Sequence, residues 1–323
     1  MSEVRFLPDD KRVAAAAGET LLAASLRSGI PHAHVCGGHA KCSTCRVRVT
    51  GGGLEALEPR TEAERDMATR LHFAPEVRLA CQARVKDEAA APVEVARLVL
   101  DSEDIELANT ASPWCTGGPI GEEKRIAILF SDIRGFTPFA EDLPAYDVIH
   151  VLNRHFYLMC AAIERHGGTV DNFLGDGIMA LFDREDPREA SFRAVAAGLD
   201  MLAAMENMRA YVQRVYGRSI DLGVGIHTGL CVVGTIGGTV YRKLTAIGDA
   251  VNLASRIESA NKAAGTRLLV SSDTYADVRD RVRAGRTVRV PIKGKTGDHA
   301  LHEVVALADG SAPGAAEVPA AAS

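Results

Sequence analysis

Phe130 to Thr137 reads Phe-Ser-Asp-Ile-Arg-Gly-Phe-Thr and follows an apolar run, Ile126 to Leu129. The apolar run predicts a buried strand, and the Gly-Phe-Thr-Pro sequence predicts a tight turn into a helix. Asp132 would then lie at the carboxyl end of the strand, beside the free backbone N–H groups of the helix start. A carboxylate in that place is suited to a metal ion that carries a polyphosphate.

A second candidate carboxylate, Asp176, lies in the sequence Leu-Gly-Asp-Gly between two apolar stretches, residues 169–173 and 178–182. The stretches predict a β-hairpin with Asp176 at its tip. In this layout Asp132 and Asp176 occupy neighbouring strand ends, close enough to share two divalent ions, which is an arrangement suited to in-line attack at phosphorus. Taken alone, Asp176 would be better explained as a turn former, because Asp-Gly is a common hairpin dipeptide.

The bulk composition bounds the class of protein. The chain has 323 residues, 24% charged and 47% hydrophobic, with a net charge of −5. The length is enough for two domains, and the acidic balance argues against general nucleic-acid binding, which needs a basic surface. No apolar run is long enough to span a bilayer, and the start at Met1 shows no signal peptide. We therefore expect a cytoplasmic protein with neither a nucleic-acid nor a membrane partner.

The cysteines are unevenly placed. Of seven, four lie in the first 81 residues: Cys36, Cys42, Cys45 and Cys81. Three thiolates in a glycine-containing loop, with a fourth far along the chain, can ligate an iron–sulfur cluster. A structural zinc site and buried free thiols are the alternatives. Zinc sites more often use two separated Cys-x2-Cys pairs, and only one such pair is present.

The segment around these cysteines resembles the [2Fe–2S] ferredoxins. It has the Cys-x5-Cys-x2-Cys…Cys spacing of the vertebrate-type members, with Gly-Glu-Thr-Leu-Leu at 18–22, Cys-Ser-Thr-Cys-Arg-Val at 42–47 and Arg-Leu-Ala-Cys-Gln at 78–82. The resemblance implies a β-grasp-like domain over residues 1–97, a cluster held by the four cysteines, and a redox partner protein. His39 lies in the ligand loop, but Rieske-type ligation replaces two cysteines by histidines, and all four cysteines are present.

Residues 98–122 predict a linker, because they are first acidic and then rich in Pro and Gly, without Lys or Arg. Residues 308–323 are rich in Ala, Gly and Pro and predict a disordered tail. Between them, residues 123–307 alternate strands with helices, which predicts an α+β sandwich with the helices packed on one side of a sheet. Two of the expected strands, 220–227 and 231–236, are separated at Thr228-Gly229.

Asn252 and Arg256 lie four residues apart in an expected helix and therefore share one of its faces. An amide and a guanidinium on one face can orient a ribose and neutralise phosphate charge. A polar pair on a helix surface is also common without any function. The pair indicates a functional site only in combination with the two candidate carboxylates, Asp132 and Asp176.

Taken together, the motifs of residues 123–307 resemble the class III nucleotidyl cyclase catalytic domain. Those motifs are Phe-Ser-Asp-Ile-Arg-Gly-Phe-Thr at 130–137, Leu-Gly-Asp-Gly-Ile-Met-Ala at 174–180, Gly-Ile-His-Thr-Gly at 225–229, Ile-Gly-Asp-Ala-Val-Asn-Leu-Ala-Ser-Arg at 247–256 and Ile-Lys-Gly-Lys at 292–295. The resemblance implies a ferredoxin-like α+β sandwich. It also implies a homodimer with two active sites, because sites in this family form between two catalytic domains.

The resemblance further implies a role for each matching residue. Asp132 and Asp176 would hold two Mg²⁺ or Mn²⁺ ions, assisted by the Ile133 carbonyl. Asn252 would orient the ribose, and Arg256 would stabilise charge on the α-phosphate. The triphosphate would be bound by the amides of the turn and by one lysine, that is by Ile133, Gly135, Phe136, Thr137 and Lys293. No clear protein general base is evident.

Base selection depends on Asn172 and Thr245, by the same resemblance. Adenine-specific members usually have Lys at the first position and Asp or Thr at the second, so Thr245 fits and Asn172 departs. Asn172 is still able to hydrogen-bond a purine edge and is not the Glu expected for guanine. A diguanylate cyclase is rejected, because its Gly-Gly-Asp/Glu-Glu-Phe hairpin is absent. ATP is therefore the expected substrate.

We expect an adenylate cyclase that is regulated by the redox or integrity state of a [2Fe–2S] cluster. Two alternatives remain open. One is a guanylate cyclase with the same mechanism. The other is an electron-transfer protein whose second domain is a weakly active, cyclase-like dimerisation module.

Overall fold

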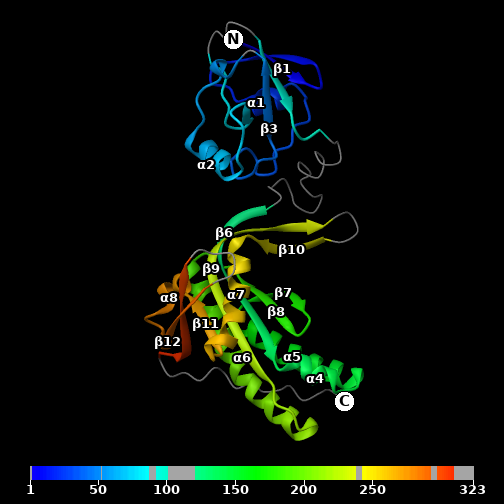
Figure 1. Ribbon diagram of the computed structural model, residues 1–323, viewed down its shortest axis with the longest axis vertical. Helices are drawn as coiled ribbons and strands as arrows, with labels where there is room; N and C mark the ends of the chain where they lie inside the picture. The colour runs from blue at the N-terminus through cyan, green and yellow to red at the C-terminus, as the bar shows by residue number, and fades with distance from the viewer. Residues whose placement is uncertain are drawn as a thin grey trace. The chain divides into compact units, whose positions relative to one another are not determined.

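The computed structural model of the chain describes residues 2–51, 53–86, 92–100, 121–237, 242–291 and 297–308. The chain divides into two compact units, Met1–Gly121 and Glu122–Ser323 (Figure 1). Most of the expected linker, and the expected tail beyond residue 308, lie outside the described residues. Each unit is therefore considered by itself.

The N-terminal unit is a five-stranded sheet in the order β2-β1-β5-β3-β4. β1 pairs antiparallel with β2 and parallel with β5, so the sheet is mixed, and Val4 and Phe6 of β1 point into a fully buried core. Thr20 caps α1 by accepting a hydrogen bond from Ala23 N. The elements are β1 Ser2–Leu7, β2 Lys11–Ala15, α1 Leu21–Arg27, β3 Arg46–Gly51, η1 Leu54–Ala56, α2 Glu62–Arg70, β4 Val77–Leu79 and β5 Val93–Arg97. The β-grasp-like prediction is confirmed.

The C-terminal unit is an eight-stranded sheet in the order β12-β13-β11-β9-β6-β8-β7, with β10 paired to β9. Its strands are β6 Gly121–Arg134, β7 Thr169–Leu174, β8 Gly177–Phe182, β9 Asp221–Gly237, β10 Arg242–Ile247, β11 Leu268–Ser271, β12 Val282–Pro291 and β13 Asp298–Leu307. Its helices are α4 Phe136–Glu141, α5 Ala145–Arg165, α6 Pro187–Tyr216, α7 Asp249–Ala264 and α8 Ser272–Val278. The α+β class is confirmed.

The helices cover both faces of this sheet, so the prediction of helices on one side is wrong. On β6, Ala127 and Leu129 belong to the core under α5 and α6, whereas Ile126 and Ile128 pack with Ala250 and Ala254 of α7. Successive side chains of a strand point to opposite faces, so α7 lies across the sheet from α5 and α6. The continuous apolar run of β6 is typical of a strand buried on both faces.

β9 runs without a break, so the predicted separation at Thr228-Gly229 is wrong. Gly229 is required by packing instead of by a turn. A Cβ atom there would lie 2.6 Å from His227 Nε2 and 3.0 Å from the Ala250 Cβ of α7. The glycine therefore lets α7 lie directly against β9.

Candidate functional site

The pairing of β6 with β8 brings the two candidate carboxylates together. Ser131 lies opposite Ile178 in the register, so Asp132 meets the tip of the β7–β8 hairpin where Asp176 lies. Ile133 N donates to Asp176 Oδ2 at 3.2 Å. A Cβ atom at Gly177 would lie 3.0 Å from the Ser131 carbonyl oxygen and 3.2 Å from Asp132 Oδ1. Only a glycine gives the hairpin tip room to approach β6 so closely.

Asp132 and Asp176 line a cavity of about 530 Å³. Its other walls are the β6–α4 turn and one side of α7. Gly135 has φ +79° and caps α4, so the predicted tight turn into a helix is present. The lining residues are Asp132, Ile133, Arg134, Gly135, Phe136, Thr137, Pro138, Asp176, Glu258, Ser259 and Lys262.

The carboxyl groups in this cavity favour a bound cation. Burial, together with repulsion from the Asp176 carboxylate, raises the pKa of Asp132 to about 6. Burial also raises the pKa of Asp176. Two such carboxyl groups are costly to ionise side by side unless positive charge is added, and oxygen ligands are those that Mg²⁺ and Mn²⁺ prefer. The residues present therefore fit divalent metal ions.

Glu258, Ser259 and Lys262 of α7 are lining residues that the sequence analysis missed. Glu258 lies close to β9 because two glycines of that strand face it. A Cβ atom at Gly225 would lie 2.1 Å from Glu258 N, and a Cβ atom at Gly223 would lie 2.5 Å from Glu258 Oε1. Burial, followed by the nearby Asp132 charge, raises the pKa of Glu258 to about 7. The available signal was the Glu258–Lys262 pair, four residues apart on the same helix and beginning two residues after Arg256.

Asn252 and Arg256 also lie on α7, as predicted, but neither lines the described part of the cavity. Asn252 is exposed and Arg256 is half-buried. The single chain therefore holds the two aspartates and the amide–guanidinium pair in different places.

The two base-selecting candidates lie on strands that an ion pair connects. Thr245 is buried on β10, and Asn172 is exposed on β7. Lys243 Nζ lies 2.9 Å from Asp171 Oδ2, and the Asp171 side chain is only 3% exposed. This contact joins β10 to β7 beside both candidates. Lys293 lies outside the described residues.

The four cysteines of the N-terminal unit gather as two pairs. The Cys42 thiol, with backbone N–H groups of Lys41, Gly38 and His39, lowers the pKa of Cys36 to about 4. The Cys45 thiol, helped by the Gln82 side chain and the Ala40 backbone, lowers the pKa of Cys81 to about 7. The pKa values of the partner thiols, Cys42 and Cys45, are raised, so the backbone amides of the loop favour one thiolate in each pair.

Within the described ranges, no three His, Cys, Asp or Glu side chains gather in a group that could hold one metal ion. The two pairs also lie near each other, because the Cys42 charge raises the pKa of Cys45 and the Cys36 charge acts in the same direction on Cys81. Two pairs match a two-iron cluster, which takes two cysteine ligands on each iron. His39 is exposed, in keeping with a residue outside the ligand set.

Each of the two units matches a different known protein family. Residues 119–304, more than half of the chain, match the adenylate and guanylate cyclase catalytic domain. The chain belongs to the adenylate and guanylate cyclase family. Residues 5–86 match the 2Fe-2S iron–sulfur cluster binding domain, so a ferredoxin-type domain precedes the cyclase domain.

Known adenylate cyclases are similar to the cyclase domain. The chain is 36% identical over 185 residues to the terminal-differentiation specific adenylate cyclase of Dictyostelium discoideum, covering 56% of this chain and 9% of that protein. It is 36% identical over 159 residues to an adenylate cyclase of Anabaena cylindrica, covering 48% of this chain and 31% of that protein. The chain thus spans less than a third of the length of these curated relatives.

Solved structures similar to this chain include both adenylyl and guanylyl cyclases. The adenylyl cyclase CyaB from P. aeruginosa is 31% identical, with a TM-score of 0.54, covering 57% of this chain and 95% of that one. The guanylyl cyclase Cya2 is 36% identical, with a TM-score of 0.55, covering 59% of this chain and 96% of that one.

Among the helices that the structure describes, none has the length and apolar character needed to cross a bilayer.

Proposed function

We propose that this protein is an adenylate cyclase, which converts ATP to 3′,5′-cyclic AMP and pyrophosphate at sites shared by two copies of the chain. The observation that carries the proposal is the Asp132–Asp176 pair at the cavity, with Asn252 and Arg256 on the same chain but outside that cavity. Each half lacks what the other supplies. Two copies would therefore complete two sites.

The chain's own groups divide the work as follows. Asp132 and Asp176 would hold two divalent ions, which would lower the pKa of the ribose 3′-hydroxyl and neutralise phosphate charge. The backbone N–H groups of the β6–α4 turn face the triphosphate oxygens, and Lys262 adds a positive charge at the wall of the cavity. Asn252 and Arg256 of the second copy orient the ribose and stabilise charge at the α-phosphate.

ATP is the proposed substrate because Thr245 fits the adenine pattern of the family and residue 172 is Asn instead of the Glu expected for guanine. Lys243 lies beside this place, where the Asp171 carboxylate holds it and balances its charge. GTP is the second candidate, since cyclases named for each nucleotide are similar to this chain.

The deciding assay measures cyclic nucleotide formation from ATP and from GTP, with Mg²⁺ or Mn²⁺. We expect faster turnover of ATP, and Asn172→Lys should maintain or raise it. Asp176→Asn is the control, and it should abolish product while the dimer persists. Absence of product from dimeric, cluster-loaded wild-type protein would favour the electron-transfer alternative, and preference for GTP would replace the substrate.

The N-terminal domain supports a regulatory proposal. Two cysteine pairs with inward backbone amides favour a [2Fe–2S] cluster on Cys36, Cys42, Cys45 and Cys81. Such a cluster supplies one-electron redox chemistry, and its reduction or loss would bias the catalytic dimer between arrangements. Cyclase rates should therefore differ among oxidised, reduced and cluster-free protein. Equal rates in all three states would contradict the regulatory role.

A further inference from the structure

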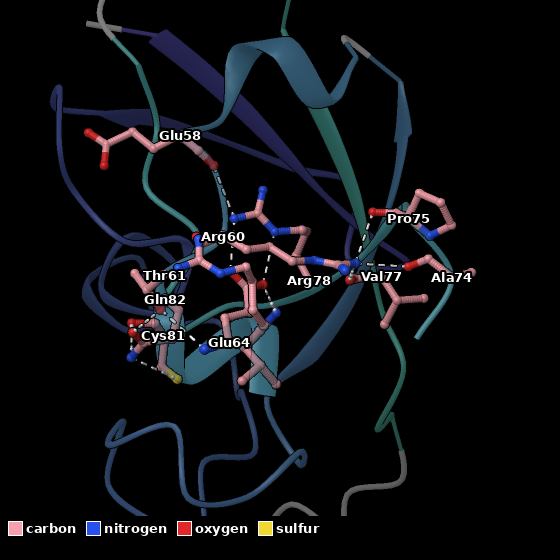
Figure 2. A network of polar contacts seen from close by, with 12 residues as sticks. Glu58, Arg60, Thr61, Glu64, Ala74, Pro75, Val77, Arg78, Cys81 and Gln82 are labelled. Carbon is pink, nitrogen blue, oxygen red and sulfur yellow. Dashed lines mark hydrogen bonds and ion pairs between the residues drawn. The ribbon is translucent and has the colours of Figure 1, made fainter. Parts of the chain in front are cut away.

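A buried ion pair fixes the segment that delivers the fourth cysteine (Figure 2). Arg78 Nε and Nη2 each donate to the Glu64 carboxylate at 2.9 Å, and the two side chains are 4% and 0% exposed. Leu79 N donates to the same carboxylate at 2.7 Å. Because Glu64 belongs to α2, the helix and the chain leading to Cys81 are held as one piece.

A second contact joins α2 to this segment on the other side of the cysteine. Thr61, the N-cap of α2, accepts from Glu64 N at 3.2 Å and donates its hydroxyl hydrogen to Gln82 Oε1 at 3.0 Å. A buried or half-buried amide held at its oxygen end has a defined direction for its NH₂ group. Figure 2 shows Thr61, Gln82 and Cys81 gathered at one end of the network.

The NH₂ group of Gln82 faces three electron-rich atoms. Its Nε2 lies 3.5 Å from the Gly38 carbonyl oxygen, 3.3 Å from the Cys81 carbonyl oxygen and 3.7 Å from Cys81 Sγ. The opposite amide orientation would place Oε1 against all three of these acceptors and would face the Thr61 hydroxyl with the amide nitrogen. The surroundings therefore select the orientation that aims an N–H at the sulfur.

We propose that Gln82 is a positioning residue that tunes the cluster, with its amide N–H held on the Cys81 sulfur by the Thr61 hydroxyl. This inference rests on the proposed [2Fe–2S] cluster. An N–H dipole directed at a ligating sulfur stabilises the electron that reduction adds, so it raises the reduction potential. The Thr61–Gln82 contact therefore makes the reduced state easier to reach.

The test is a spectroelectrochemical titration of the full-length, cluster-loaded protein. Gln82→Leu removes the N–H and should lower the midpoint potential. Thr61→Val removes the hydroxyl that holds the amide and should lower it in the same direction, whereas Thr61→Ser keeps the hydroxyl and should leave it at the wild-type value. The double variant Thr61→Val/Gln82→Leu should match Gln82→Leu alone, because both changes act through one N–H.

Two controls separate tuning from folding. Thr61→Val also removes the cap of α2, but Gln82→Leu leaves that cap in place, and Gln82→Met supplies a side chain of similar length without a donor. The electron paramagnetic resonance spectrum of the reduced cluster provides a second readout, and its g-values should shift with Gln82→Leu and Gln82→Met but not with Thr61→Ser.

Three outcomes would overturn the inference. A cluster present in every variant at an unchanged potential removes the role of Gln82. Independent, additive shifts for Thr61→Val and Gln82→Leu remove the role of Thr61. A wild-type protein without the visible absorption of a [2Fe–2S] cluster removes the inference together with the proposed cofactor, an outcome distinct from the other two.

Discussion

At the scale of single residues, burial of the Asp132 carboxyl beside Asp176 lowers the stability of the folded chain above the pKa of this group. Its pKa of about 6 lies above the value of about 3.9 for an unfolded aspartate. Between these two pH values the folded chain binds more protons than the unfolded chain. The contribution of this group to the free energy of unfolding therefore falls as the pH rises through that window, and stays lower above it.

Asp132→Asn should consequently separate stability from activity. In metal-free protein we expect the substitution to raise the melting temperature at pH 8, with a smaller gain at pH 5, where the wild-type carboxyl is largely protonated. Cyclase activity should fall by more than about 100-fold, since loss of an outer-sphere partner alone costs 10- to 100-fold. Thermal unfolding in a chelator at both pH values, with a cyclase assay, checks this.

Asp280→Asn is the matched control, because its side chain is 90% exposed and lies outside the residues lining the cavity. It should change neither the melting temperature nor the rate. An Asp132→Asn protein that is less stable than wild type at pH 8 without metal would contradict the proposed electrostatic conflict between the two aspartates.

At the scale of elements, the approach of α7 to β9 decides what the cavity contains. Gly225 lies beneath Glu258, and a Cβ atom there would meet backbone N and Cα of that residue at 2.1 and 2.5 Å. Backbone cannot move aside as a side chain does, so the helix itself would have to shift. The same helix carries Asn252, Arg256 and Glu258, so a shift would disturb the cavity and the Asn252–Arg256 pair together.

Gly225→Ala should therefore destabilise the cyclase domain by about 1–3 kcal/mol and lower the cyclase rate. Denaturant unfolding gives the first quantity and a steady-state assay gives the second. Gly285→Ala is the control: its Cβ atom would meet the side-chain atoms Glu303 Oε2 at 2.6 Å and Val305 Cγ1 at 3.1 Å on β13, away from the α7–β9 contact. Similar losses for both substitutions would show that the α7–β9 contact is not special.

At the scale of the whole molecule, the proposed function pairs Asp132 and Asp176 of one copy with Asn252 and Arg256 of a second copy. An Asp132→Ala chain retains Arg256, and an Arg256→Ala chain retains Asp132. A heterodimer of the two would contain one complete site and one doubly damaged site. Random pairing makes half of the dimers heterodimers, so the mixture should recover about one quarter of wild-type activity.

Each variant alone should lose activity, by about 10²- to 10³-fold for Arg256→Ala, which removes charge stabilisation at the phosphate. The assay needs proof of exchange, for example from two different affinity tags on one dimer. A mixture that forms tagged heterodimers and stays inactive would exclude sites shared between copies.

Features that depend on local order could be predicted from the sequence. The apolar run before Asp132, the Leu-Gly-Asp-Gly hairpin and the cysteine spacing are each contained in a few adjacent residues. Local propensity and covalent spacing therefore specify them. The structure brings Asp132 to Asp176 as the hairpin predicted, and gathers the four cysteines as their spacing predicted.

Features that depend on close approach between distant segments could be seen only in the folded chain. Glu258 joins the cavity because glycines of β9 leave room for α7, and α7 lies opposite α6 because β6 is apolar on both faces. The Thr61–Gln82 contact spans 21 residues. Such contacts depend on how side chains of separate elements fill one space, and the periodicity of a single segment carries no record of its neighbour.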